Sequence, residues 1–370
     1  MQHRVSGVLA AISSIDPTTV GTFAVVAAAT RYAFGSIALL MIPLLGVTLV
    51  GATWVGSSYG CGLQGAIRRE FGTVTSLIFF TAVVATAFAT LVADLDASAA
   101  ALARLAHLRC DMRWLIAPLA GAMLLLIRSH AKAPCERVLA GLVGAFFGYC
   151  VSACFAHPDW RAVASAALQP VQTVRSDPID AIAVVGTVLT SYVYVWQSIV
   201  AARDAAQAKQ PRQTHVEALL GSVCAGAAGF FIIVACGASL SPSMAAVLTS
   251  ADSAPALLSD SGPFAAAFFA SALLASGILA MIVLTSTTTS CILEAFAPIR
   301  TTARDVRAHS HGVEAIVLAC ATAAAMTGIE PMRLLYGSSL AAGLSAPVTI
   351  VAFAAIMFRC GRRVRVPSPS

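Results

Sequence analysis

The chain has 370 residues, of which 58% are hydrophobic and only 11% are charged. Soluble domains usually carry about 25% charged residues, so this composition excludes an ordinary water-soluble domain and predicts a protein that crosses a membrane repeatedly. The formal net charge is +6. Because the basic residues gather in short loops between apolar windows, topology and anionic lipid account for this charge, and no nucleic-acid partner is expected.

Apolar windows long enough to cross a bilayer recur along the whole chain. A spanning helix needs roughly 20 mostly apolar residues. The windows cover residues 8–30, 36–58, 73–93, 112–127, 137–156, 181–202, 216–240, 263–293, 313–329 and 333–358. The expected fold class is therefore an all-α integral membrane protein with about ten transmembrane helices.

Lysines and arginines are concentrated in alternate loops between these windows. The positive-inside bias then predicts a multi-pass protein of a bacterial-type inner membrane, with both termini cytoplasmic and a basic tail at 359–370. The first apolar segment is longer than the core of a signal peptide, so no cleaved signal is expected. The lipid bilayer is the expected surrounding, and no obligate protein partner is indicated.

The first window contains an acid followed directly by a proline, in "IDPTTVGT". An aspartate at mid-membrane costs about 2.5 to 3.5 kcal/mol and usually faces a cavity or a substrate path. Pro17 cannot donate a backbone hydrogen bond and breaks a helix. Freed carbonyls beside the Asp16 carboxylate are typical of cation sites in secondary transporters. The alternative is a proline kink in which a protonated Asp16 bonds to the neighbouring backbone.

An inverted repeat would place a second irregular segment five spans later. The sixth window reads "AIAVVGTVLTSYVYVWQSIVAARD". Its centre departs from apolar character at Gly186, Thr187, Thr190, Ser191, Tyr192 and Gln197. This window contains no proline, and threonine or serine hydroxyls can simply bond carbonyls of their own helix, so the sequence alone leaves a break and a continuous helix both open.

Five stretches of this sequence resemble the NRAMP family of divalent metal transporters. "IDPTTVGT" is similar to the family's DP-containing first helix, and "GTVLTSYVYVWQ" resembles the sixth-helix motif of a bacterial NRAMP-related branch. "GCGLQGAIRREFG", "TSADSAPALLSDSGPFAAAFFASALLASGILA" and "IEPMRLLYGSSLAAGLSAP" match in the same order. The resemblance implies a LeuT-type fold of the APC superfamily, with inverted five-helix repeats at 1–160 and 161–358 and discontinuous helices 1 and 6.

The resemblance also implies a set of metal ligands. Asp16 corresponds to the family's DP aspartate and Thr19 to its asparagine. The backbone carbonyl ligand of the sixth helix falls at Thr187, and the position of the family's methionine falls at Thr190. Residues expected behind these ligands or along the ion path are Thr22, Ser191, Tyr192 and Gln197.

Thr190 offers a hydroxyl where typical family members offer a soft thioether. A site made only of oxygen ligands suits hard ions, so manganese or magnesium is favoured over iron or cadmium. The ion is the transported substrate, and no cofactor is expected. Alternating access around Asp16 is the expected mechanism.

Typical members carry a histidine on the sixth helix and an acid on the third helix, and both serve proton movement. Here the sixth window has no histidine, and the window 73–93 has no ionisable residue before Asp94. Weak or absent proton coupling is therefore expected. Asp94 and Asp96 are expected on the external side, where they could draw in cations, although such charges are usually only solvated loop residues. Glu294 is expected as an interfacial charge. The hydroxyls of "TSTTTS", residues 285–290, are expected to bond their own helix, with an ion path as the alternative.

Two other functions are compatible with the sequence. A transporter of an amino acid or another organic solute would have the same fold, with Asp16 facing an amine. A metal sensor or scaffold would keep the fold without transport. The chain lacks a P-loop and a GxSxG motif, so enzymatic activity is not expected.

Overall fold

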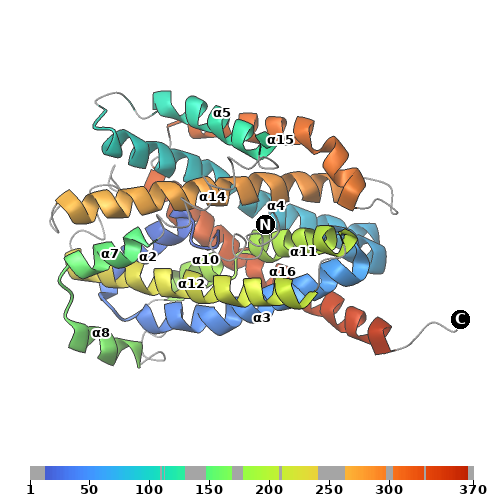
Figure 1. Ribbon diagram of the computed structural model, residues 1–370, viewed down its shortest axis with the longest axis horizontal. Coiled ribbons are helices and arrows are strands. Elements are labelled where there is room, and N and C mark those ends of the chain that lie inside the picture. Colours follow the sequence, from blue (N-terminus) through green and yellow to red (C-terminus); the bar gives the residue numbers. More distant parts are fainter. Residues whose placement is uncertain are drawn as a thin grey trace, which may run out of the picture.

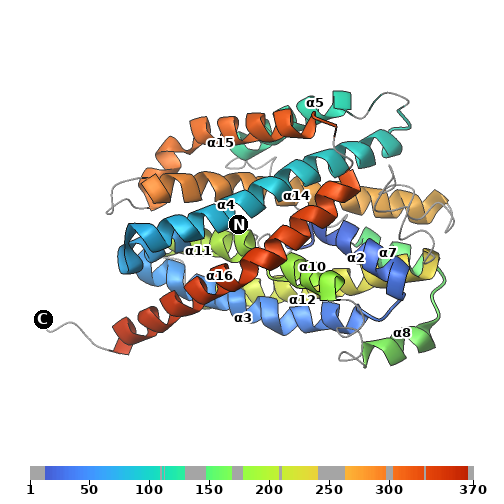
Figure 2. The ribbon, with the colours of Figure 1, turned by 180° about the vertical axis from the view of Figure 1, so that it is seen from behind.

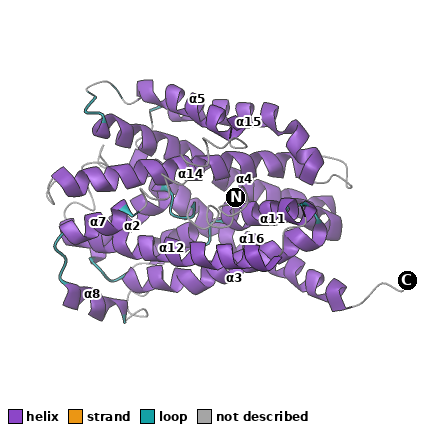
Figure 3. Cartoon of the chain, in the orientation of Figure 1, coloured by secondary structure: helices purple, strands orange, loops and turns teal. Residues whose placement is uncertain are grey.

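A computed structural model supplies the three-dimensional structure. It describes residues 13–108, 111, 113–129, 147–168, 178–207, 211–240, 263–296, 303–328 and 331–365. Every regular element in these ranges is an α-helix (Figure 3).

The helices follow the order of the apolar windows. They are α2 (Pro17–Thr30), α3 (Gly35–Tyr59), α4 (Leu63–Leu105), α5 (Arg113–Ser129), α7 (Gly148–Phe155), α8 (Trp160–Ala167), α10 (Pro178–Val188), α11 (Ser191–Ala206), α12 (Pro211–Ser239), α14 (Pro263–Phe296), α15 (Ala303–Ala325) and α16 (Pro331–Arg365). Of the predicted first window only the part from residue 13 is described, and of the fifth only the part from residue 147.

Six helical segments in the described part of the chain are long and apolar enough to cross a membrane. They are Gly35–Tyr59, Leu63–Leu105, Pro178–Ala206, His215–Ser239, Ala267–Phe296 and Arg333–Gly361. Backbone groups in a bilayer must bond within the chain, and a helix satisfies them all internally. The prediction of an all-α membrane protein is confirmed.

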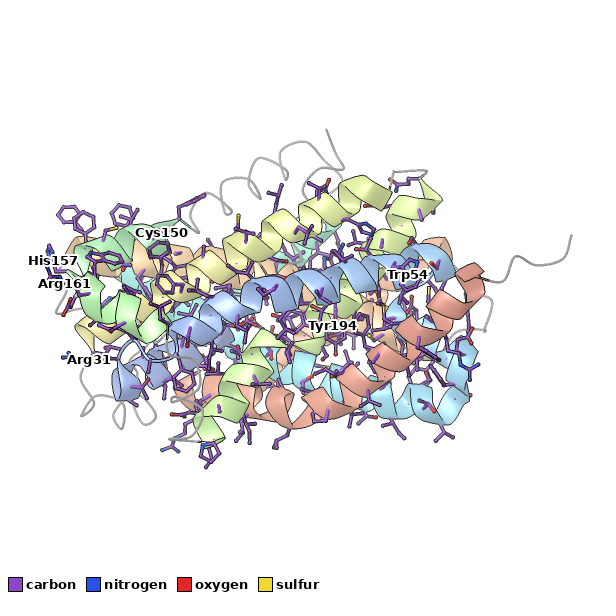
Figure 4. The ribbon with its side chains drawn as sticks, turned by 90° about the horizontal axis from the view of Figure 1, so that it is seen from below. Arg31, Trp54, Cys150, His157, Arg161 and Tyr194 are labelled. Carbon is purple, nitrogen blue, oxygen red and sulfur yellow. The ribbon has the colours of Figure 1, made fainter. Side chains whose placement is uncertain are left out.

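The long helices form one elongated bundle (Figure 1). α14 packs extensively on α4, and α12 packs on α3. α5 and α15 lie together along one edge of the bundle. Seen from behind, α16 crosses the bundle obliquely in front of α4 (Figure 2). In Figure 4, Arg31 and His157 lie at one end of the bundle and Trp54 lies toward the other.

The chain is non-helical at both places where the sequence suggests a break. α2 starts at Pro17, after a turn at residues 13–15, and the chain between α10 and α11 leaves helical geometry at Leu189 and Thr190. The sixth window is therefore broken, and its continuous alternative is wrong; in the first window, α2 starts at the predicted Asp16–Pro17 position. Residues 8–12 of the first window lie outside the described part of the chain.

The third helix differs from its predicted extent. Gly72 has φ 82°, a left-handed conformation that glycine adopts without a steric penalty, and it separates a short segment, Leu63–Phe71, from the long span that starts at Thr73. This start agrees with the window 73–93. The helix continues to Leu105 instead of ending at residue 93, because "ADLDASAAALARL" contains strong helix formers and no glycine or proline.

Small residues let α10 and α16 approach each other closely. A Cβ atom at Gly186 would collide with the backbone of Ser339 and Gly343, and a Cβ at Gly343 would collide with the Ile182 carbonyl. Close approach of helix backbones through glycine is typical of helix packing in lipid. This contact holds α10, the first half of the broken sixth helix, against α16.

Candidate metal site

Asp16 is the N-cap of α2 and is almost fully buried. Its Oδ1 accepts a hydrogen bond of 2.6 Å from the backbone N–H of Thr19. Pro17 occupies the first helical position, where its missing N–H would have no helical partner anyway. The sequence "DPTT" thus starts a helix, and it places a carboxylate at the positive end of the helix dipole.

Tyr192 joins the start of α11 to the start of α2. Its hydroxyl lies 2.7 Å from Asp16 Oδ2 and 2.9 Å from the carbonyl oxygen of Ser13, within donor reach of both. Tyr192 is the second residue of α11 and is fully buried. The start of α11 is therefore held against the start of α2.

Three threonines form a second connection between the same two breaks. The hydroxyls of Thr19 and Thr187 lie 2.6 Å apart, and the Thr19 hydroxyl also donates to the carbonyl of Ser14 at 2.8 Å. The Thr190 hydroxyl donates to the Thr187 carbonyl at 2.6 Å. All three side chains are buried. Asp16 and the three threonines, the predicted ligand set, thus belong to one hydrogen-bonded group.

The four residues that were predicted behind the ligands or along the ion path have different surroundings in the structure. Tyr192 contacts Asp16 directly, and Ser191 is the buried first residue of α11. The Thr22 hydroxyl lies 2.6 Å from the Ser339 hydroxyl of α16 and donates to the Thr18 carbonyl. Gln197 points elsewhere: its Nε2 donates to the Thr53 hydroxyl of α3 at 2.8 Å. These hydrogen bonds connect Thr22 to α16 and Gln197 to α3.

Asp94 lies at this site, and its predicted place in a solvated loop is wrong. It is fully buried on α4. Its Oδ1 accepts from the Thr18 hydroxyl at 3.0 Å and from the Thr18 backbone N–H at 3.2 Å. Asp96 is buried as well, so its predicted exposure is also wrong. The alanine-rich run from residue 97 is the signal that the helix continues and encloses both acids.

Two carboxylates therefore converge on the first turn of α2. Asp16 and Asp94 accept from the adjacent backbone amides of Thr19 and Thr18. Free N–H groups and the helix dipole make a helix N-terminus favourable for negative charge. Two ionised carboxylates so placed would repel each other, and a bound cation would relieve that repulsion.

The ligand chemistry here is that of oxygen. In the described ranges, no three His, Cys, Asp or Glu residues come together in a way that could hold a metal ion. The polar atoms at the two breaks are carboxylates, hydroxyls and carbonyls. Such groups suit hard cations that keep part of their water shell.

The threonines of α14 do not bond their own helix as predicted. The hydroxyls of Thr285, Thr287, Thr288 and Thr289 are buried and have no hydrogen-bond partner among the described residues. Threonines elsewhere, such as Thr53, do donate to the carbonyl four residues earlier. The own-helix prediction is wrong for these four hydroxyls.

Glu294 is buried, and its predicted role as an interfacial charge is wrong. Its Oε1 accepts from the Gly62 N–H at 2.7 Å, and its Oε2 accepts from the Gly65 N–H at 2.9 Å. The next amide, that of Leu63, donates to the Ser198 hydroxyl at 2.8 Å. The N-terminus of α4 is thus capped by side chains of α14 and α11.

Comparison with known proteins found a matching sequence family. Residues 7–359 match the sequence family described as natural resistance-associated macrophage protein-like (Nramp). The comparison with curated proteins found no match.

Solved structures of an Eremococcus coleocola manganese transporter are similar in fold. One mutant of that transporter has a TM-score of 0.70 and 17% sequence identity, and the match covers 95% of this chain and 78% of that chain. Its complex with an aromatic bis-isothiourea substituted compound has a TM-score of 0.69 and 18% identity, with the same coverage. These neighbours have the LeuT-type fold, and at this identity the likeness concerns the fold alone.

Proposed function

The chain belongs to the Nramp family of divalent metal transporters, and we propose that it carries manganese or magnesium through the oxygens around Asp16 by alternating access. It is a membrane transporter and not an enzyme. The observation that carries the proposal is the hydrogen-bonded group of Asp16, Tyr192 and the three threonines at the two helix breaks.

The preference for hard ions rests on the donor atoms. Asp16 supplies carboxylate oxygens, Thr19 and Thr190 supply hydroxyls, and Thr187 supplies a carbonyl. A Thr190 side chain cannot offer the thioether that soft ions prefer. The ion then replaces hydrogen bonds that these atoms make to one another, and keeps some of its water.

Alternating access is supported by the helices that meet at the site. α2, α10 and α11 end or begin there, and α16 contacts α2 through Thr22 and Ser339. Rocking of one repeat against the other would expose the site to each side in turn. We assign the repeats to residues 1–160 and 161–358. Both termini are proposed to face the cytoplasm of a bacterial-type inner membrane.

The buried position of Asp94 bears on proton coupling. The prediction of weak coupling had two premises, the absence of an acid on the third helix and the absence of a histidine on the sixth. Asp94 removes the first premise, because it is a buried acid of α4 beside the start of α2. The proposal of weak coupling now stands on the second premise alone: α10 and α11 contain no histidine.

Transport in proteoliposomes tests the proposal. Flux of magnesium, manganese, calcium and cadmium would be measured with an internal dye, with internal pH recorded at the same time. We expect manganese or magnesium flux in the natural protein, none in Asp16→Ala, and little acidification. Cadmium transport with acidification would contradict both the hard-ion and the weak-coupling proposals.

The same proteoliposome measurements distinguish two other functions from metal transport. Uptake of an organic solute without metal flux would identify an amino-acid-type transporter in which Asp16 faces an amine. Metal binding without flux of any ion would identify a sensor or scaffold. Either result would end the proposal of metal transport.

A further inference from the structure

Two oxygen atoms on α4 lack partners beside the proposed site. Asp94 Oδ2 and Ser98 Oγ are buried, and neither has a hydrogen-bond partner in the described part of the chain. Residues four apart on a helix lie on one face, about 5 to 6 Å from each other. The two oxygens therefore belong to the same side of α4.

That side of α4 is closed by α2 and α14. Asp94 Oδ1 is bonded to Thr18 of α2. A Cβ atom at Gly277 of α14 would collide with Ser98 Oγ and lie 3.0 Å from Pro17 Cγ. Ser98 therefore lies against the glycine of α14, and the proline of α2 is next to both.

An unpaired carboxylate oxygen in this position needs a partner. A buried polar atom left without a hydrogen bond costs about 1 to 3 kcal/mol, and more when it is charged. The Thr18 donors reach only Oδ1. Pro17 and Gly277 bring no side-chain donor, so a cation is the natural partner for Oδ2.

We propose that Asp94 Oδ2 and Ser98 Oγ form a second position for the transported divalent cation, next to the Asp16 position and enclosed by α2, α4 and α14. This inference rests on the proposed function. The ion would move between the two carboxylates, and water would complete its coordination. One ion occupies one position at a time, because the two carboxylates together carry two negative charges, which one divalent cation balances.

Manganese binding to the full-length protein in lipid nanodiscs tests the inference, with calorimetry and the Mn²⁺ electron paramagnetic resonance spectrum as readouts. Asparagine at position 16 or 94 keeps one acceptor oxygen of the carboxylate that it replaces. At position 16 it is also a favourable N-cap for α2. In Asp16→Asn we expect flux to be lost but one Mn²⁺ to remain bound, with affinity lowered by roughly 10- to 100-fold. In the double variant Asp16→Asn/Asp94→Asn we expect no bound Mn²⁺.

A matched control uses Asp96, a buried acid two residues after Asp94. The double variant Asp16→Asn/Asp96→Asn should still bind one Mn²⁺. Asp16→Asn/Gly277→Ala should lose the ion without any change of charge on α4, since the new methyl group occupies the space beside Ser98. Gel filtration and thermal melts of each variant would show that it is folded.

Several results would overturn the second position. These are loss of Mn²⁺ in Asp16→Asn alone, binding that persists in the double variant with Asp94→Asn, and loss of the ion in the Asp96→Asn control. In all three cases flux by the natural protein would leave the transport proposal standing. Absence of both binding and flux in the natural protein would instead remove the transport proposal itself.

Discussion

The cap at the start of α4 leads to a quantitative prediction about stability. Glu294 of α14 accepts hydrogen bonds from the backbone amides of Gly62 and Gly65, which lie more than 200 residues away in the sequence. A Cβ at Gly62 would lie 2.7 Å from both Glu294 Oε2 and Ile199 Cγ1. Only glycine lets the backbone and the carboxylate come this close.

The magnitude follows from these two bonds. Glu294→Ala leaves two buried N–H groups without an acceptor, at about 1 to 3 kcal/mol each, so we expect the free energy of unfolding to fall by about 2 to 6 kcal/mol. Glu294→Gln keeps one acceptor oxygen and turns an NH₂ group toward the other amide. We expect a loss of about 1.5 to 3 kcal/mol, since a hydrogen bond to a charged group is replaced.

Equilibrium unfolding in mixed micelles measures both losses. Glu314→Gln is the matched control, because the carboxylate of Glu314 also packs into the protein but pairs with His311, whose side chain is 63% exposed. A pair with so exposed a partner contributes at most about 1 kcal/mol. Stabilisation of the α4 N-terminus by Glu294 is refuted if both Glu294 variants lose no more stability than the control.

Three further predictions concern the site and its surroundings. Tyr192→Phe removes the donor that orients Asp16 Oδ2, so we expect roughly tenfold weaker Mn²⁺ binding by titration; unchanged affinity would show that Asp16 needs no such support. Thr190→Met adds a soft ligand, so cadmium flux should rise relative to magnesium flux, and an unchanged ratio would argue against a role of Thr190. Burial, with a smaller contribution from the Glu294 charge, raises the pKa of the Cys61 thiol in the α3–α4 turn to about 12. The thiolate forms only as pH rises toward that value, so at pH 7.5 maleimide should label Cys61 far more slowly in the folded protein than in the unfolded protein; equal rates would contradict the closed turn.

The sequence by itself determined which segments form helices and where α2 starts, and it left the break in the sixth window open. A bilayer requires about 20 apolar residues for each span, and this requirement is visible in composition without any knowledge of packing. Asp16 and Pro17 mark the start of α2 because capping and proline placement are local effects. The ligand assignment at Thr19, Thr187 and Thr190 came from resemblance. The structure links the Thr19 and Thr187 hydroxyls and bonds the Thr190 hydroxyl to the Thr187 carbonyl, and binding of metal by these residues stays a prediction.

Only the tertiary structure decided what the remaining polar residues contact. Thr18 and Asp94 are 76 residues apart, and Gly62 and Glu294 are 232 residues apart. A hydropathy window ends at the first charge and so places Asp94 outside the membrane. Its burial depends on α2 and α14, which cover that face of α4. The physical reason is that the environment of a side chain near a helix end is set by its neighbours in space, and local sequence does not encode them.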